Sequence, residues 1–288
     1  MKKLVYFTAI AAALLAVSSC QEKPIDQPEV LPAPANAVNA KKLVLANNDL
    51  NIKSIEFTEA GRYLIAFLEV APVSSAPTKA AGDIISYLTG SYTVSGNTYT
   101  LQGYGTVTID GSGVTVNPDN GPQTNATFSD ATQNPASDIY TTVARTWKVD
   151  NSRITVNAEG KNVTVTKPGC DLPSVAAELA QKGVNIKQEQ VAGYVVKDVI
   201  FTKSKTFAVE FTGNDPFVGE FDLKSDNTFT YNFDGTLGND FFNASSNGSV
   251  NYVAEDQQLV FSVSAKLKKA DGSKTYSGTV TMYLSELK

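Results

Sequence analysis

Residues 52–58, IKSIEFT, recur later in the chain as residues 196–202, VKDVIFT, and the two segments align without a gap. Two aromatic positions beyond these segments also match at the same offset, Tyr63 with Phe207 and Phe67 with Phe211. Further on, residues 90–100, GSYTVSGNTYT, match residues 219–230, GEFDLKSDNTFT, with one inserted residue. Similarity of this kind indicates that the two halves are copies of one strand unit. The alternative is that β-hairpins resemble each other through shared alternation and turn chemistry.

Apolar and polar residues alternate in the runs around these matches, for example in residues 91–94, 98–101 and 106–109. Turn residues separate the runs, as in residues 95–97, SGN, and 110–113, DGSG. This pattern predicts antiparallel strands joined by hairpin turns. The fold class that we expect is therefore mainly β, with antiparallel meanders forming one or two barrels or sandwiches.

The chain offers one good helix candidate, residues 172–182. Asp171 is placed as its N-cap and Gly183 as its stop, and its apolar residues recur at helical spacing. Strands are expected at residues 146–149, 152–156 and 162–165, and the polar stretch 117–138 is expected to be a long loop or a linker. These features divide the chain into a first β unit, residues 41–138, and a second β unit with the helix, residues 139–288.

The N-terminus has the features of a secretory signal. Lys2 and Lys3 precede an apolar run, residues 4–17, that is too short to span a membrane. The end of the run and the residues that follow it, residues 15–20, LAVSSC, resemble the lipobox of bacterial lipoproteins. That resemblance implies removal of residues 1–19 and acylation of Cys20 by chains such as palmitate, with an ordinary secretory signal as the alternative. Several acyl chains would hold the protein stably on a membrane.

The residues after Cys20 bear on location. Gln21 stands where lipoproteins retained in the inner membrane of enterobacteria have Asp, so the resemblance implies the outer membrane of a Gram-negative bacterium. Glu22 and Asp26 are similar to the acidic tract of surface-exported lipoproteins of Bacteroidota. Residues 20–40 carry four prolines and no apolar period, which predicts an extended tether.

Trp147, the only tryptophan, begins a predicted strand and resembles the opening strand of lipocalin-like domains, although Arg145 and Ala144 precede it where a glycine is usual. The resemblance implies a barrel in which Trp147 lies in the core. Cys170 has no partner if Cys20 is acylated, so we expect it to be a buried, unreactive thiol.

Composition excludes several activities. The chain has no histidine, which removes the Ser-His and Cys-His pairs, histidine bases and histidine metal ligands. Loss of Lys2 and Lys3 with the signal leaves 22 of the 24 basic residues against 29 acidic ones, which disfavours nucleic-acid binding. Neither Asn117–Asn120 nor Asp226-Asn227 has the spacing of a calcium loop. We expect no cofactor and no metal.

Two kinds of site stay open. Paired carboxylates could hydrolyse a glycoside, and the candidates are Asp234, Asp240, Glu210 and Glu220. The loop at residues 238–246, GNDFFNASS, could instead bind a ligand through two aromatic rings beside polar groups, with the packing of both rings in the core as the alternative. The ligand-binding candidates are Asp240, Phe241, Phe242 and Asn243.

The function that we expect is a membrane-tethered, non-enzymatic lipoprotein that binds a glycan, a peptide or a small amphiphile. A histidine-free hydrolase and a purely structural envelope protein are the alternatives. The hydrolase predicts two carboxyl groups facing each other across a cleft, and the binding module predicts a cavity lined by aromatic residues. A structural protein predicts neither feature.

Overall fold

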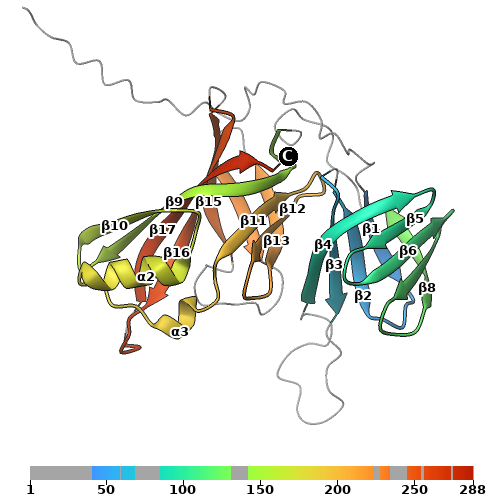
Figure 1. Cartoon of the computed structure of the whole chain (residues 1–288), viewed down its shortest axis with the longest axis horizontal. Coiled ribbons are helices and arrows are strands. Elements are labelled where there is room, and N and C mark those ends of the chain that lie inside the picture. The colour runs from blue at the N-terminus through green and yellow to red at the C-terminus, as the bar shows by residue number, and fades with distance from the viewer. Residues whose placement is uncertain are drawn as a thin grey trace, which may run out of the picture.

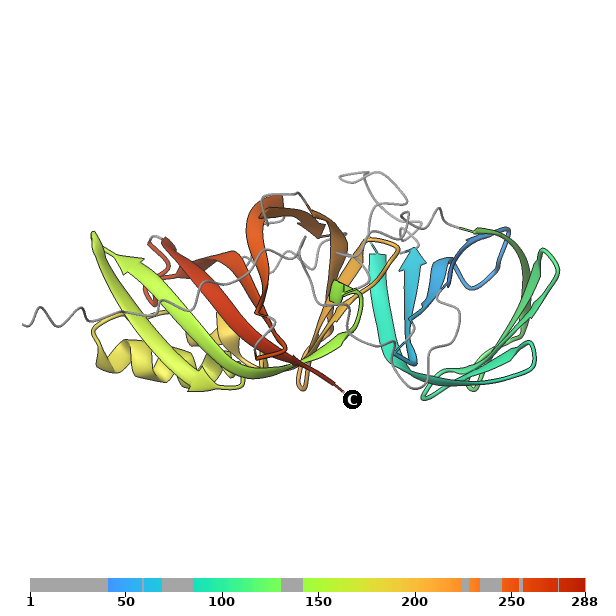
Figure 2. The same cartoon turned by 90° about the horizontal axis from the view of Figure 1, so that it is seen from above.

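The computed structural model describes residues 41–58, 60–68, 85–130, 142–223, 228–233, 245–253, 256–273 and 275–287. The signal, Cys20 and the tether lie outside the described residues, and so do Asp240, Phe241, Phe242 and Asn243. The fold is mainly β, as the sequence predicts, with a closed antiparallel barrel and a curled antiparallel sheet (Figure 1). Figure 2 shows the barrel and the sheet side by side along the long axis.

The barrel contains eight strands in sequence order, and β1 closes it by pairing with β8. Aromatic rings fill its interior, where Phe57 contacts Tyr92 edge to face and lies 4.1 Å, centroid to centroid, from Tyr99. The predicted turns are present between β4 and β5 and between β6 and β7. The strands are β1 (Lys41–Ala46), β2 (Ile52–Phe57), β3 (Arg62–Leu68), β4 (Ile85–Ser95), β5 (Thr98–Leu101), β6 (Gly105–Asp110), β7 (Gly113–Pro118) and β8 (Thr124–Asp130).

The prediction of a loop or linker over residues 117–138 is wrong for its first part, because β7 extends to Pro118 and β8 covers Thr124–Asp130. The polar residues of β8 alternate with inward positions such as Ala126, which is buried. A strand with Asn and Thr on its solvent face therefore resembles a loop in composition.

The sheet contains nine strands, and eight of them, β9 and β11–β17, form a closed circuit of paired neighbours because β9 also pairs with β17. β10 extends the sheet beyond β9. The strands are β9 (Thr146–Ala158), β10 (Lys161–Pro168), β11 (Val196–Phe201), β12 (Thr206–Phe211), β13 (Phe217–Leu223), β14 (Thr228–Phe233), β15 (Ser245–Val253), β16 (Gln258–Lys268) and β17 (Thr275–Glu286).

Residues 146–149 and 152–156, predicted as two strands, belong to one long strand, β9. The register between β9 and β17 shifts at Asp150, whose carbonyl oxygen accepts a hydrogen bond from the Gly169 amide. β9 pairs with β11 before this irregularity and with β10 after it. A bulge inside a continuous strand produces the polar interruption that the sequence shows.

Helix α2 (Leu172–Gln181) confirms the predicted helix, and the Asp171 carboxylate accepts a hydrogen bond from the Ser174 amide at its N-cap. The structure adds a four-residue helix, α3 (Gln188–Val191). Both helices lie in the connection between β10 and β11, the two strands that pair with different parts of β9. The apolar face of α2 packs into the core of the sheet through Leu172, Val175, Ala176 and Leu179.

The repeated segments occupy equivalent strands in the two units. The β2–β3 pair shifts register between Ile52 and Ser54, and the β11–β12 pair shifts between Val196 and Asp198, which are the matching residues. The turn after each first strand is also the same. In each turn a threonine hydroxyl, of Thr58 or Thr202, accepts a hydrogen bond from the amide four residues later. Shared bulges and turns favour a common strand unit over chance hairpin similarity.

Candidate functional site

The two units meet through the outward faces of equivalent strands. Outward residues of β3, β11, β12 and β13 form a buried apolar cluster against which Tyr87 of β4 packs. Residues on the outside of a barrel are normally exposed and polar, so this cluster explains why the strands in the contact are apolar on both faces. The cluster consists of Leu64, Ile200, Ala208 and Val218.

The contact has an approximate two-fold relationship. Leu64 and Ala208, both in the cluster, are equivalent residues of β3 and β12. Two hollows lie at this contact, and several of the strand positions that line one are equivalent to positions of the opposite unit that line the other. Three pairs of equivalent residues line the two hollows, Lys53 with Lys197, Ala66 with Glu210, and Thr206 with Arg62.

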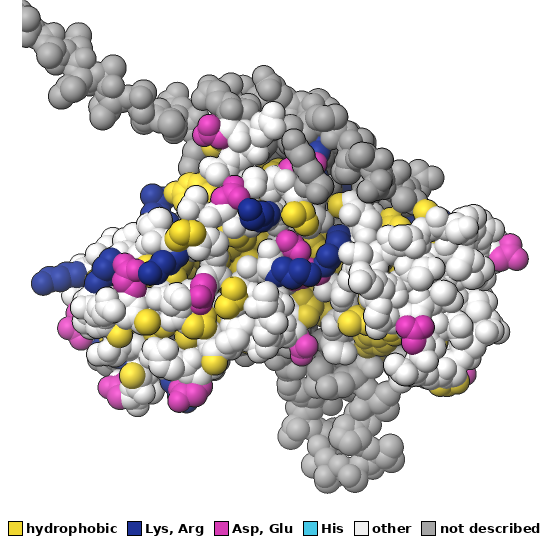
Figure 3. Space-filling view, in the orientation of Figure 1, with side chains coloured by type: hydrophobic (Ala, Val, Ile, Leu, Met, Phe, Trp, Pro, Cys, Tyr) yellow, Lys and Arg dark blue, Asp and Glu magenta, His cyan; other side chains and the backbone are white. Residues whose placement is uncertain are grey.

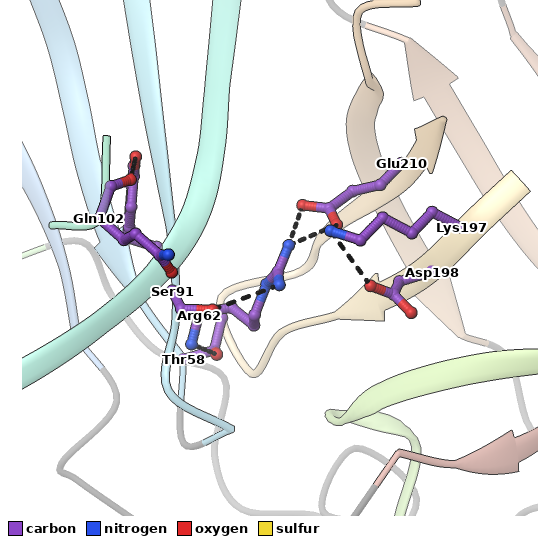
Figure 4. A network of polar contacts seen from close by, with 8 residues as sticks. Thr58, Arg62, Ser91, Gln102, Lys197, Asp198 and Glu210 are labelled. Carbon is purple, nitrogen blue, oxygen red and sulfur yellow. Dashed lines mark hydrogen bonds and ion pairs between the residues drawn. The ribbon is translucent and has the colours of Figure 1, made fainter. Parts of the chain in front are cut away.

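One hollow, the Arg62 groove, has a volume of about 450 Å³ and is lined by Arg62, Tyr87, Lys197 and Glu210 among other residues. The Arg62 guanidinium donates to both carboxylate oxygens of Glu210, and so joins the barrel to the sheet (Figure 4). Basic and acidic side chains gather between the two units in Figure 3. Both contacts are made by one guanidinium nitrogen, Nη2, so a single charge-assisted contact between buried side chains links the two units here.

Asp198 is buried next to Glu210, its partner across β11 and β12. Burial, together with the negative charge of Glu210, raises the pKa of the Asp198 carboxyl, and the positive charges of Arg62 and Lys197 oppose this increase. The Lys197 ammonium lies 3.9 Å from Asp198 and 3.7 Å from Glu210. The two acids therefore belong to a structural ion cluster in the contact between the units.

The other hollow, the Glu56 groove, has a volume of about 290 Å³ and is lined by Lys42, Glu56, Tyr87, Thr206 and Glu220 among other residues. The arginine and glutamate that bridge the Arg62 groove are replaced here by their equivalents Thr206 and Ala66, which are too short to form such a bridge.

Glu56 supplies the most distinctive group of this groove. Its side chain is only 4% exposed, and its Oε2 atom accepts no hydrogen bond. The Lys42 ammonium lies 3.7 Å from that oxygen and donates to the Thr206 hydroxyl at 2.9 Å. The equivalent of Glu56 in the second unit is Ile200, which belongs to the apolar cluster. A buried carboxylate oxygen without a donor is costly, unless something that the groove binds supplies one.

The structure places the predicted site residues apart. Glu210 lies in the ion cluster, and Glu220 is exposed at the rim of the Glu56 groove. Asp234 and Asp240 lie outside the described residues, as does the aromatic loop, so their proposed roles stay predictions. Glu210 does face a second carboxyl group, that of Asp198, but it is bonded to Arg62, which is the arrangement of a structural pair.

Two other residues follow expectation. Trp147 is fully buried, and its indole nitrogen donates to the Val143 carbonyl at 2.9 Å. Cys170 is buried, and burial raises the pKa of its thiol to about 12, so the thiol is not ionised at neutral pH.

Within the described part of the chain, no group of three His, Cys, Asp or Glu side chains could hold a metal ion.

Sequence reasoning missed Lys42, Glu56 and Arg62. One signal could have found Glu56, because it is the acidic position in an apolar segment whose copy has isoleucine there. When one copy of a repeat has a charged residue at a position where the other copy has an apolar one, the two strands contact different surroundings at that position. The sequence of one copy alone could not predict which residues form the contact between the units.

No family model and no curated protein matches this chain. None of the helices in the described residues is both long and apolar enough to cross a membrane. The assignment of function therefore depends on the chemistry of the two grooves.

Proposed function

We propose that the protein is a membrane-tethered, non-enzymatic lipoprotein that binds a polar ligand in the Glu56 groove. The tether is the acylated Cys20 and the proline-rich residues that follow it, and the outer membrane is its location. The observation that carries the binding site is the buried Glu56 carboxylate, with one oxygen that accepts no hydrogen bond, in the wall of a groove. A ligand with a hydrogen-bond donor would satisfy that oxygen.

The difference between the two grooves supports this choice. In the Arg62 groove the buried carboxylate of Glu210 has a guanidinium partner from the opposite unit. In the Glu56 groove the residues that could provide such a partner are small. An unpaired buried acceptor costs about 1–3 kcal/mol, and a charged one costs more. Binding of a donor would recover part of this free energy.

Two measurements test the proposal. Cys20→Ala should move the protein from the membrane fraction to the soluble fraction, and continued membrane association would contradict acylation as the tether. The released protein is then titrated, with amide chemical shifts as readout, against neutral oligosaccharides, a lysine-rich peptide and a dodecyl phosphocholine monomer. At least one class should shift residues of the groove, and Glu56→Gln should abolish the shift. Glu159→Gln, which alters an exposed acid far from the groove, is the control.

A hydrolase is the second candidate, because Glu220 lines the same groove as Glu56 and two carboxyl groups are what glycoside hydrolysis requires. The same samples decide between the two functions. Oligosaccharides recovered intact after prolonged incubation support binding alone, whereas cleavage that is lost in both Glu56→Gln and Glu220→Gln would establish the hydrolase.

A further inference from the structure

The charged residues that line the Glu56 groove have a net charge of zero. Lys42 and Lys53 supply two positive charges, and Glu56 and Glu220 supply two negative ones. A cationic ligand would compete with Lys42 for Glu56, and an anionic ligand would be repelled by both acids. The groove is therefore suited to a neutral ligand.

A donor and an acceptor stand next to each other in the wall. The Lys42 ammonium has three N–H donors, and the structure assigns one of them to the Thr206 hydroxyl. The Glu56 Oε2 atom lies 3.7 Å away and accepts no hydrogen bond. Two hydroxyls on adjacent carbons fit this pair once the Glu56 carboxylate, whose Oε2 atom is covered by protein atoms, turns toward the groove, because one can then donate to Glu56 while its neighbour accepts from Lys42. A single amine or a single carbonyl can use only one of the two groups.

The rest of the wall is partly apolar. Leu64, Ala66 and the half-buried ring of Tyr87 line the groove beside the polar pair. A sugar ring has the matching division, with hydroxyls around its rim and C–H groups on its face. Aromatic and aliphatic side chains contact such a face, while a few placed polar groups fix its orientation.

The volume sets the size of the ligand. About 290 Å³ corresponds to roughly ten water molecules at about 30 Å³ each. That space accommodates one sugar ring with its hydroxyls, and it is too small for several linked rings. The bound group is then a single residue or the end of a glycan chain.

On this basis, and resting on the proposed function, we infer that the Glu56 groove binds one neutral sugar ring through two adjacent hydroxyls, held by Glu56 and Lys42. Within the described residues, only one of the two grooves has this pair. Lys42 pairs with Glu56 across β1 and β2, and the equivalent pair across β9 and β11 is Thr146 with Ile200, which cannot make these bonds. The duplicated groove therefore lacks both binding groups.

The test titrates the soluble Cys20→Ala protein with methyl glycosides of glucose, galactose and mannose, followed by the monodeoxy derivatives of the best binder. We expect one site per chain and a loss of affinity of about tenfold or more when either of two adjacent hydroxyls is removed. Glu56→Gln and Lys42→Met should cause similar losses. Lys197→Met, which changes the equivalent of a groove lysine on the other side of the contact, should leave the affinity unchanged.

The outcomes separate the inference from the proposed function. If the lysine-rich peptide or the phosphocholine detergent binds in the groove and depends on Glu56, but no glycoside does, the function stands and the sugar assignment is overturned. If glycosides bind and no pair of adjacent hydroxyls matters, the diol assignment is overturned. If no probe of any class shifts the groove residues, both are overturned. Thermal unfolding of each variant shows whether its fold is intact.

Discussion

The Arg62 groove and the Glu56 groove are built from equivalent strands, but the buried glutamate of each groove has a different partner. In the first, an arginine from one unit bridges to a buried glutamate of the other. In the second, a buried glutamate keeps an oxygen without a hydrogen bond, and the bridging positions are threonine and alanine. The two units share equivalent strands at this contact, and a few outward residues on β2, β3 and β12 determine that one groove joins the units while the other is left open.

The largest expected effect comes from breaking the bridge in the Arg62 groove. Arg62→Ala leaves Glu210 buried beside Asp198 without its guanidinium partner, which should lower the free energy of unfolding by about 3–5 kcal/mol. Denaturant unfolding measures the change. Lys161→Ala is the control, since that side chain is exposed on β10, outside the ion cluster, and should change stability by no more than about 0.5 kcal/mol. A loss below 1 kcal/mol for Arg62→Ala would show that the bridge does not hold the units together.

The next effect concerns the packing of an aromatic ring against a glycine, a pairing that both units share and that can be tested in the barrel. Gly90 pairs with Tyr63 and its equivalent Gly219 pairs with Phe207. A Cβ atom at Gly90 would lie 2.6 Å from the Tyr63 ring, so Gly90→Ala should destabilise the barrel by about 1–3 kcal/mol.

The control for this substitution is Gly113→Ala, where the new Cβ atom would lie 3.4 Å from its nearest neighbour, the Asp110 carbonyl oxygen. It should change stability little. Equal unfolding midpoints for the two variants would mean that the Tyr63 ring can shift at no cost, and that the glycine is not required by the packing.

A smaller effect depends on pH and concerns the acid pair of the Arg62 groove. The pKa of Asp198 is raised by burial and by Glu210, so ionisation of this carboxyl is harder in the folded protein than in the unfolded chain. Below its ordinary value of 3.8 both states keep the proton, and the group has no net effect on stability. Between that value and the raised pKa the unfolded chain ionises while the folded protein keeps the proton, so the free energy of unfolding falls across this range and stays lower above it.

Asp198→Asn should therefore raise the melting temperature at pH 7 by a few degrees at most, and the gain should shrink as the pH falls toward 3. Melting curves of parent and variant at pH 3, 5 and 7 measure the difference. The opposite trend, with the variant less stable at pH 7 than at pH 3 relative to the parent, would show that Asp198 is held as a favourable ion.

Much of the fold could be predicted from the sequence because it depends on local patterns. Alternation identified the β class, turn residues marked the hairpins, and Asp171 and Gly183 bounded the helix. Errors occurred where local composition conflicts with tertiary pairing. β8 has the polar residues of a loop, and β9 continues through an irregularity at Asp150 because two different neighbours pair with its two halves.

The candidate site was less predictable, since it arises only when the units meet. Glu210 and Glu220 were named as candidates, but they line different hollows, and Arg62, the partner that defines the role of Glu210, comes from the other unit. The sequence could show that Glu56 and Ile200 differ at equivalent positions. It could not show that each position faces the other unit.

The most direct test of the account replaces the pair Lys42 and Glu56 by the residues at the equivalent positions, Thr146 and Ile200. The double variant Lys42→Thr/Glu56→Ile removes a buried pair and adds apolar surface, so its stability should equal that of the parent or exceed it by about 1–4 kcal/mol. Titration with the best-binding methyl glycoside should then show no binding to the folded variant. Undiminished binding by this variant would contradict the assignment of the Glu56 groove as the ligand site.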